Sequence, residues 1–134
     1  TGRTIQEGEE VAILTLGHIG NYAIEAAELL EKEGIRPAIY DMRFVKPLDE
    51  QLLKTIFNKF DKVITVEDGC LMGGFGSAVV EWMADNGAQA QVKRLGIPDE
   101  IVEHGTQLEL HRECGFDPEG IAQAVEQMLE PVKS

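Results

Sequence analysis

Residues 37–49 read PAIYDMRFVKPLD and join two elements of different kinds. Pro37 to Met42 is an apolar run of the length expected for a buried strand, and Asp49 is typical of a helix N-cap. Arg43 and Lys46 lie between them. In α/β proteins, functional residues usually lie at the C-terminal ends of parallel strands. The stretch therefore predicts a strand-to-helix connection and a first candidate for an anion-binding site.

The rest of the chain repeats this alternation of apolar runs and amphipathic stretches, which indicates β-α units. Arg3 to Gln6 is predicted to be a short antiparallel edge strand, because no helix separates it from the next strand. The other strands are predicted at Val11 to Leu16, Val63 to Val66 and Val92 to Ile97. Helices are predicted from about Asn21 to a stop at Gly34, from Asp49, from Phe75 to Met83, after Thr106 and after Asp117-Pro118. With no internal repeat or linker, residues 1–134 are predicted to form one domain.

Composition excludes several classes of function. The chain has 134 residues, 43% of them apolar, which fits one globular domain with a core of its own. A formal net charge of −12 argues against nucleic acid and against an anionic membrane surface as partners. No apolar run is long enough to span a bilayer. The first residues resemble no secretory signal and lack an initiator methionine, so a cytoplasmic fragment of a longer chain is expected.

The chain holds two cysteines, Cys70 and Cys114, which have no metal-ligand spacing and are expected to be free thiols. A glycine-rich turn, GCLMGGFGS, spans residues 69–77. Its backbone N–H groups, at Gly73, Gly74 and Gly76, could face an anion at a helix N-terminus. Alternatively, the glycines permit a tight turn and close helix packing, or face a neighbouring domain. The turn lacks the Lys-Ser/Thr end of a P-loop.

Two acids precede that turn, and they have two interpretations as well. Glu67 and Asp68 could serve acid–base chemistry. They could also repel a phosphate, or contact a basic group such as Arg43 or Lys46. Those two basic residues are in turn either an anion site or local ion-pair partners of nearby acids. Adjacent strand residues point to opposite faces, so the two carboxylates need not converge.

His104 lies in IPDEIVEHG, residues 97–105, and forms no HExxH zinc motif with His111. It either hydrogen-bonds within its loop or faces a neighbouring domain or a substrate. His18 is equally isolated. No Ser-His-Asp or Cys-His arrangement can be argued from the spacings, and no metal ligand set is predicted. The residues alone therefore indicate no catalytic centre.

Several segments in order are similar to the C-terminal domain of thiamine-diphosphate enzymes of the transketolase type. The similar segments are Val11 to Gly17, Asp41 to Asp49, Val66-Glu67-Asp68 with Gly73-Gly74-Phe75-Gly76, and the final loop. Within that family the chain most resembles the 1-deoxy-D-xylulose-5-phosphate synthases. This narrower resemblance rests on Arg43 to Asp49, on Leu95 to Asp99 with His104-Gly105-Thr106, and on Gly115-Phe116-Asp117 with Gly120-Ile121.

The resemblance implies a three-layer α/β/α sandwich around a five-stranded mixed sheet whose first strand is antiparallel. It also implies a transferase that condenses pyruvate with glyceraldehyde 3-phosphate for isoprenoid, thiamine and pyridoxal synthesis. Thiamine diphosphate and magnesium would be held by two N-terminal domains, so that this domain binds no cofactor and holds no catalytic residue. Its expected partners are those domains and a second subunit of a homodimer. Arg43, Lys46, Glu67, Gly73, Gly74, Gly76 and His104 are then anion or domain-interface candidates.

Two alternatives remain open at this point. The C-terminal domain of a 2-oxoacid dehydrogenase β subunit shares the first three segments in looser form. A free-standing α/β ligand-binding module is also compatible with basic residues and glycines at strand ends.

Overall fold

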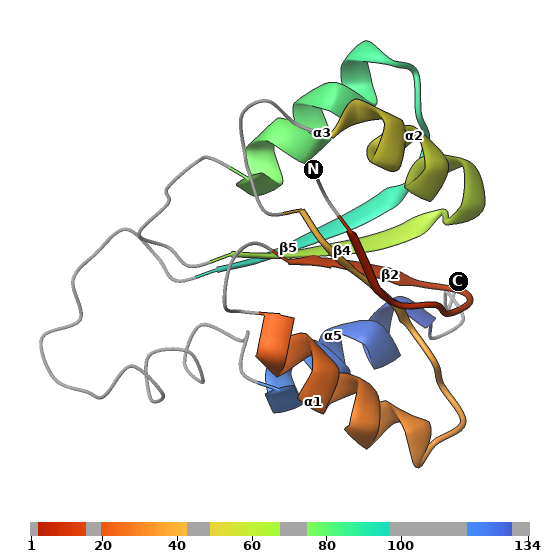
Figure 1. Cartoon of the computed structure of the whole chain (residues 1–134), viewed down its shortest axis with the longest axis vertical. Coiled ribbons are helices and arrows are strands. Elements are labelled where there is room, and N and C mark those ends of the chain that lie inside the picture. The colour runs from red at the N-terminus through yellow and green to blue at the C-terminus, as the bar shows by residue number, and fades with distance from the viewer. Residues whose placement is uncertain (1–2, 16–19, 43–48, 68–74, 97–117, 130–134) are drawn as a thin grey trace, which may run out of the picture.

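A five-stranded mixed sheet forms the middle layer of the protein (Figure 1). The computed structural model describes residues 3–15, 20–42, 49–67, 75–96 and 118–129. The strands are β1 (Arg3–Gln6), β2 (Ala12–Thr15), β3 (Ala38–Asp41), β4 (Lys62–Glu67) and β5 (Gln91–Gly96), in the spatial order β1-β3-β2-β4-β5. Strands β2 to β5 are parallel, whereas β1 pairs antiparallel with β3 at the edge. The prediction of a mixed sheet with an antiparallel first strand is confirmed.

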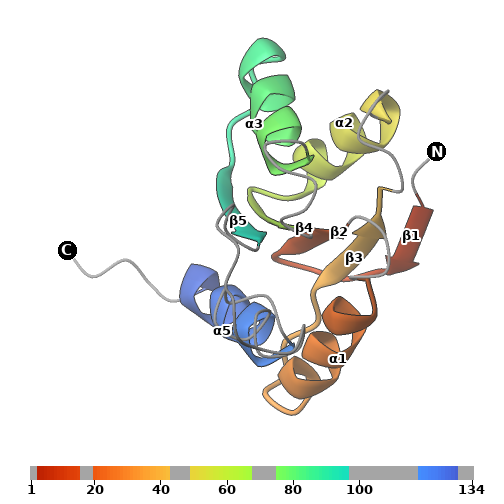
Figure 2. The ribbon, with the colours of Figure 1, turned by 90° about the vertical axis from the view of Figure 1, so that its left-hand side faces the viewer.

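Helices cover both faces of this sheet. They are α1 (Gly20–Glu31), α2 (Glu50–Lys59), α3 (Phe75–Asp85) and α5 (Pro118–Leu129). Figure 2 shows α1 and α5 against one face and α2 and α3 against the other, which confirms the predicted three layers. Among the described helices, none has both the length and the apolar character needed to cross a bilayer.

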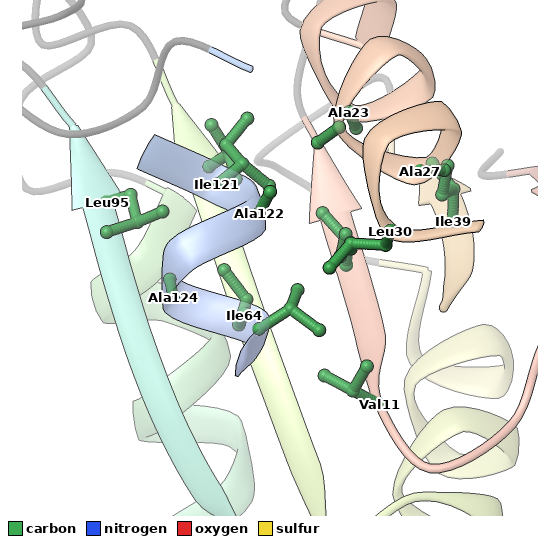
Figure 3. Packing of buried hydrophobic residues seen from close by; sticks show 14 of the residues in the cluster. Val11, Ala23, Ala27, Leu30, Ile39, Ile64, Leu95, Ile121, Ala122 and Ala124 are labelled. Carbon is green, nitrogen blue, oxygen red and sulfur yellow. The ribbon is translucent and has the colours of Figure 1, made fainter. Parts of the chain in front are cut away.

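The first core lies between the sheet and helices α1 and α5 (Figure 3). Ile13, Ile39 and Ile64 are fully buried there, at the centres of three adjacent strands. Leu30 of α1 and Ile121 of α5 pack onto them from the helices. Full burial of an aliphatic side chain of this size stabilises a fold by ~1.5–3 kcal/mol. Helices α1 and α5 also contact each other, so this face is covered continuously.

The second core lies between the opposite face and helices α2 and α3. Leu14 and Val63 from the sheet pack with Leu53 and Ile56 from α2. Because side chains alternate along a strand, β2 sends Ile13 to the first core and Leu14 to the second. All four residues of β2 are buried, as the continuous apolar run in the sequence predicts for a strand covered on both sides.

Helix ends follow local rules that the sequence predicted. Asp49 caps α2, with its Oδ1 accepting a hydrogen bond from the backbone N–H of Leu52 at 3.0 Å. Helix α1 ends in a Schellman motif: Gly34, at φ +79°, donates its N–H to the carbonyl of Glu31, and Ile35 donates to that of Leu30. Pro118 is the first residue of α5, also as predicted.

The N-terminal ends of the parallel strands hold a tight turn that the sequence did not predict. The N–H of Val11 donates to the carbonyl of Glu9 at 2.8 Å, and the intervening Glu10 has φ 72°. This is a γ-turn of the rarer, strained form. Beside it, Gly8 lies so close to the backbone of Ala38 that a Cβ at this position would overlap the Ala38 nitrogen. The connection between β1 and β2 is therefore held firmly against the start of β3.

Tyr40 is the one tyrosine of the second core. Its ring makes an edge-to-face contact with Phe60, with 6.4 Å between ring centroids. Burial, and to a lesser extent the negative charge of Glu7, raises the pKa of the Tyr40 hydroxyl. Glu7 itself forms an ion pair with Lys59 of α2, with 3.6 Å between Oε2 and Nζ.

Candidate functional site

The C-terminal ends of the parallel strands meet along one edge of the sheet, where the sequence predicted function. Thr15 pairs with Asp41 and with Val66, and Glu67 pairs with Gly96, so the strand ends lie in register. Of the seven predicted site residues, Glu67 and Gly76 are described. Outside the described residues lie Arg43, Lys46, Gly73, Gly74 and His104. Their predicted roles stay predictions.

Glu67 and Gly76, which the sequence separates by the glycine-rich turn, are brought into direct contact. The backbone N–H of Gly76 donates a hydrogen bond to Oε1 of Glu67 at 3.0 Å. Gly76 is the second residue of α3, so the half-buried carboxylate takes one of the N–H groups that no helical carbonyl can satisfy. Its negative charge is also favourable at the positive end of the helix dipole. Glu67 therefore caps α3 and ties the end of β4 to the start of the helix.

This contact bears on the two interpretations of the glycine-rich turn. An anion-binding helix N-terminus needs free backbone N–H groups and no competing negative charge. At Gly76 the N–H is already used by a carboxylate of the same chain. The contact of Gly76, within the described residues 75–77 of this turn, therefore supports the interpretation of tight helix packing over that of phosphate binding.

Gly76 lies close to side chains of the sheet at the start of α3. A Cβ on this residue would lie 3.1 Å from Oγ1 of Thr65 and 3.1 Å from Cδ of Arg94. Thr65 is fully buried, and its hydroxyl is the one buried side-chain oxygen without a hydrogen-bond partner among the described residues. The helix therefore rests directly on β4, and a Cβ at position 76 would require the side chains of Thr65 and Arg94 to give by a few tenths of an ångström.

Arg94 of β5 is a site residue that sequence reasoning missed. Thr65 and Arg94 are paired in the parallel ladder, so both side chains lie on the α3 face of the sheet. Nη1 of Arg94 donates to Oγ of Ser77 at 3.3 Å across the first turn of α3. Side chains two positions apart on a strand lie on the same face of the sheet, and Val92 packs against the second core. The sequence could therefore have indicated that Arg94, two positions after Val92, lies on the α3 face.

The described part of this edge positions a helix rather than building a reaction centre. Buried Thr15 donates from its hydroxyl to the carbonyl of Tyr40 at 3.4 Å, which is a structural contact between neighbouring strands. In the described ranges, no three His, Cys, Asp or Glu side chains are grouped so that they could hold a metal ion. What remains is a set of contacts, Glu67 to Gly76 and Arg94 to Ser77, that fix α3 on β4 and β5.

Comparison with known proteins agrees with this fold. Residues 1–121 match the family model for the C-terminal domain of transketolase. The chain is 67% identical over 124 residues to the 1-deoxy-D-xylulose-5-phosphate synthase of Cytophaga hutchinsonii, a match that covers 92% of this chain and 20% of that protein. The synthase of Aquifex aeolicus is 46% identical over 129 residues, covering 96% of this chain and 20% of its own length. This chain thus spans about a fifth of the length of these relatives.

Solved structures with the same fold include transketolases. A split-gene transketolase, solved as an inactive β4 tetramer, has a TM-score of 0.84 at 33% identity and is matched over 96% of this chain and 42% of that one. A transketolase of Campylobacter jejuni has a TM-score of 0.63 at 18% identity, over 94% of this chain and 18% of that one, a likeness that concerns the fold alone. The family match covers most of the sequence and the sheet topology agrees with it, and the chain belongs to the transketolase C-terminal domain family.

Proposed function

We propose that this chain is the C-terminal domain of a 1-deoxy-D-xylulose-5-phosphate synthase. The observation that carries the proposal is the 67% identity to the Cytophaga hutchinsonii synthase, which spans 92% of this chain but 20% of that protein. The split-gene transketolase, of the same fold, is 33% identical. The higher sequence identity to the synthase favours a synthase over a transketolase. The 67% identity to a synthase also favours this assignment over the 2-oxoacid dehydrogenase β subunit, and the match to 20% of that longer protein favours it over a free-standing ligand-binding module.

The reaction of the whole enzyme follows from this assignment. Pyruvate loses carbon dioxide, and its remaining two carbons are joined to the aldehyde carbon of glyceraldehyde 3-phosphate to give 1-deoxy-D-xylulose 5-phosphate. Thiamine diphosphate, held through magnesium, supplies the electron sink for this chemistry when it is bound. The product would feed isoprenoid, thiamine and pyridoxal synthesis. As part of the same proposal, the enzyme is a cytoplasmic homodimer whose two N-terminal domains hold the cofactor.

The described residues of this chain do not fit the cofactor. They contain no group of three metal-ligating side chains that could hold magnesium. The carboxylate of Glu67 occupies the Gly76 N–H at the start of α3, where it would repel a diphosphate. We therefore assign this domain a structural role and derive no catalytic step from its residues.

Support for that structural role comes from the way the strand ends are built. Glu67 and Arg94 fix the first turn of α3 against the sheet, and Asp49 fixes the first turn of α2. The segments of sequence that precede these two helices contain Arg43, Lys46, Gly73 and Gly74. A rigid helix start on each side would hold those segments in place against a neighbouring domain. The proposal places these residues, together with His104, at the contact with the rest of the enzyme.

A domain exchange tests the assignment. This chain replaces the matching fifth of the Cytophaga hutchinsonii synthase, and formation of 1-deoxy-D-xylulose 5-phosphate is measured. The same exchange with the C-terminal domain of the Campylobacter jejuni transketolase is the control, because it keeps the fold but has diverged surfaces. We expect activity near that of the parent enzyme for the first exchange and a large loss for the second. A soluble, folded first chimera without activity contradicts the proposal.

Calorimetry on the chain itself tests the absence of a cofactor site. Titration with thiamine diphosphate and magnesium is expected to give no binding heat, whereas the whole Cytophaga hutchinsonii synthase gives saturable heat under the same conditions. Binding by the chain in the micromolar range would refute the structural role without refuting the family.

A further inference from the structure

A groove runs between the edge strand β1 and helix α1. It is a partly enclosed hollow of about 240 Å³, which we name the β1–α1 groove. Its lining includes Gln6 from β1, Ile24, Ala27, Glu28 and Glu31 from α1, and Ile35 from the loop before β3. In Figure 2, α1 lies below β3 and β1, and its neighbour α5 lies next to it below β5. The groove lies near the start of β3, at the opposite end of the parallel strands from Glu67 and Gly76.

The floor of the groove is apolar and one apolar side chain at its rim is exposed. Ala27 is buried and Ile35 half-buried, and both pack on the first core. Ile24 is 37% exposed and is one of two large hydrophobic residues on the described surface with that much exposure. An aliphatic side chain placed in the hollow would cover Ile24 and extend the core beneath it.

The groove also borders an unpaired sheet edge. β1 is hydrogen-bonded to β3 on one side, and among the described strands none pairs with its other side. An exposed strand edge offers backbone N–H and C=O groups to an added strand. A β-bulge shifts the register between Thr4 and Gln6 and brings Gln6 to the groove side, where its Nε2 donates to the carbonyl of Pro37 at 2.7 Å. An edge strand beside a helix is the arrangement in which peptides bind by strand addition.

Charge decides which partner this groove fits. Ile24, Ala27, Glu28 and Glu31 recur at i, i+3, i+4 and i+7, so the apolar residues and the acids form one stripe along α1. Glu28 and Glu31 are exposed. The lining also holds one basic side chain, Arg36, whose Nε donates to the carbonyl of Glu7 at 3.1 Å, so two negative charges face one positive charge there. A second copy of this chain, itself at net charge −12, would bring acids to acids.

We propose that the β1–α1 groove binds an extended peptide segment, added to β1 as a further strand, in which lysine or arginine lies two positions before and two positions after an aliphatic residue, so that all three side chains face α1. Its aliphatic side chain enters the hollow over Ala27 and Ile35. Its basic side chains pair with Glu28 and Glu31 along the rim. The inference goes beyond the role of this domain in the synthase and does not depend on it.

Binding is measured by fluorescence anisotropy on the 134-residue chain. The probe is a labelled octapeptide in which valine and lysine alternate at every second position with threonine between them, and its counterpart has glutamate in place of lysine. We expect saturable binding of the basic probe at one site and none of the acidic one. The same probe, N-methylated at alternate backbone nitrogens, cannot pair with a strand edge on that side and is expected to bind about tenfold more weakly. Equal affinity for the methylated probe overturns strand addition.

Matched variants separate the groove from the overall charge. Glu28→Lys with Glu31→Lys reverses the two rim acids, whereas Glu25→Lys with Glu33→Lys makes the same change in net charge at exposed positions outside the groove. We expect the first pair to lose about tenfold or more in affinity and the second to stay within about threefold. Ile24→Ser, at an exposed position, should weaken binding without unfolding the chain, which circular dichroism checks.

Three further outcomes overturn the proposal. The probe fails to bind, both double variants lose affinity equally, or sedimentation shows a dimer that the Glu28→Lys and Glu31→Lys change abolishes. The last result would assign the groove to a second copy of the chain.

Discussion

The hydrogen bond from the Gly76 N–H to Glu67 predicts how much the carboxylate contributes to stability. Glu67→Ala removes the cap and leaves one N–H of the first turn of α3 without its partner. A lost N-cap typically costs ~0.5–2 kcal/mol, and a hydrogen bond to a charged group is at the upper end of that range. We therefore expect Glu67→Ala to lower the free energy of unfolding by ~1–2 kcal/mol, equivalent to roughly 3–8 °C in Tm for a domain of this size.

Glu67→Gln separates the charge from the hydrogen bond. The amide oxygen can still accept from Gly76, but it has no charge to interact with the helix dipole, which is worth ~0.3–1 kcal/mol. The loss should therefore be smaller than for alanine. Glu81→Ala, an exposed position in the middle of α3, is the control and should change stability by no more than ~0.5 kcal/mol.

Urea unfolding followed in two ways gives the measurement. Far-ultraviolet circular dichroism reports the whole chain, and the fluorescence of Trp82 reports α3, since this is the single tryptophan of the sequence and stacks on Phe57 of α2 with 5.7 Å between ring centroids. If Glu67→Ala is as stable as Glu81→Ala by both signals, the capping role is wrong. If glutamine and alanine cost the same, the hydrogen bond contributes nothing beyond the charge.

Three further predictions concern Gly8, Glu10 and Tyr40, which lie outside the Glu67–Gly76 contact at the C-terminal strand ends. Gly8→Ala should destabilise the fold by more than ~2 kcal/mol, because the new Cβ overlaps the backbone of Ala38; near-parental stability in urea would contradict that close approach. Glu10→Gly should raise stability by ~0.5–1 kcal/mol by relieving the γ-turn at φ 72°, and thermal unfolding that shows a loss would mean the glutamate is unstrained. In a Tyr22→Phe background Tyr40 is the sole tyrosine, so its near-ultraviolet titration should give a native-state pKa above the ordinary value near 10. The protonated hydroxyl favours the folded state, so this contribution to stability is complete below about pH 10 and declines as the pH rises further. Ionisation of native Tyr40 at or below that value would refute its burial.

Much of the fold could be predicted from apolar periodicity. The predicted strands Val11 to Leu16 and Val63 to Val66 correspond to β2 at Ala12–Thr15 and β4 at Lys62–Glu67, within two residues at each end. A strand buried on both faces needs an unbroken apolar run, and few other structures use one of that length. Helix starts could also be predicted where a polar side chain caps the first turn, as at Asp49. The antiparallel direction of β1 followed from the lack of a crossover helix.

Features that depend on contacts between distant segments could not be predicted from the sequence pattern. The need for glycine at position 8 arises from the backbone of β3, some thirty residues further along the chain. The γ-turn at Glu10 has no residue that marks it, because glutamate is not a typical left-handed residue.

The contacts within the candidate site could not be predicted from the sequence either. Glu67 and Gly76 were both singled out, but as separate features of an acid pair and a glycine-rich turn. The hydrogen bond that joins them depends on how α3 returns to the end of β4. Arg94 was overlooked because β5 is the strand with the weakest apolar pattern, and its link to Ser77 exists only once β5 lies beside β4.

The position of β1 has a consequence for synthesis on the ribosome. Of the five strands of this sheet β1 is made first, yet its only described neighbour in the sheet, β3, begins 35 positions later. At ~5–20 residues per second, β1 waits roughly two to seven seconds before a partner exists. During that interval its backbone is open to solvent and to chaperones, whereas β2, β3 and β4 can assemble among themselves. We therefore expect pulse-labelled hydrogen exchange on refolding chains to find the amides of β1 protected last, as the closing step of the sheet.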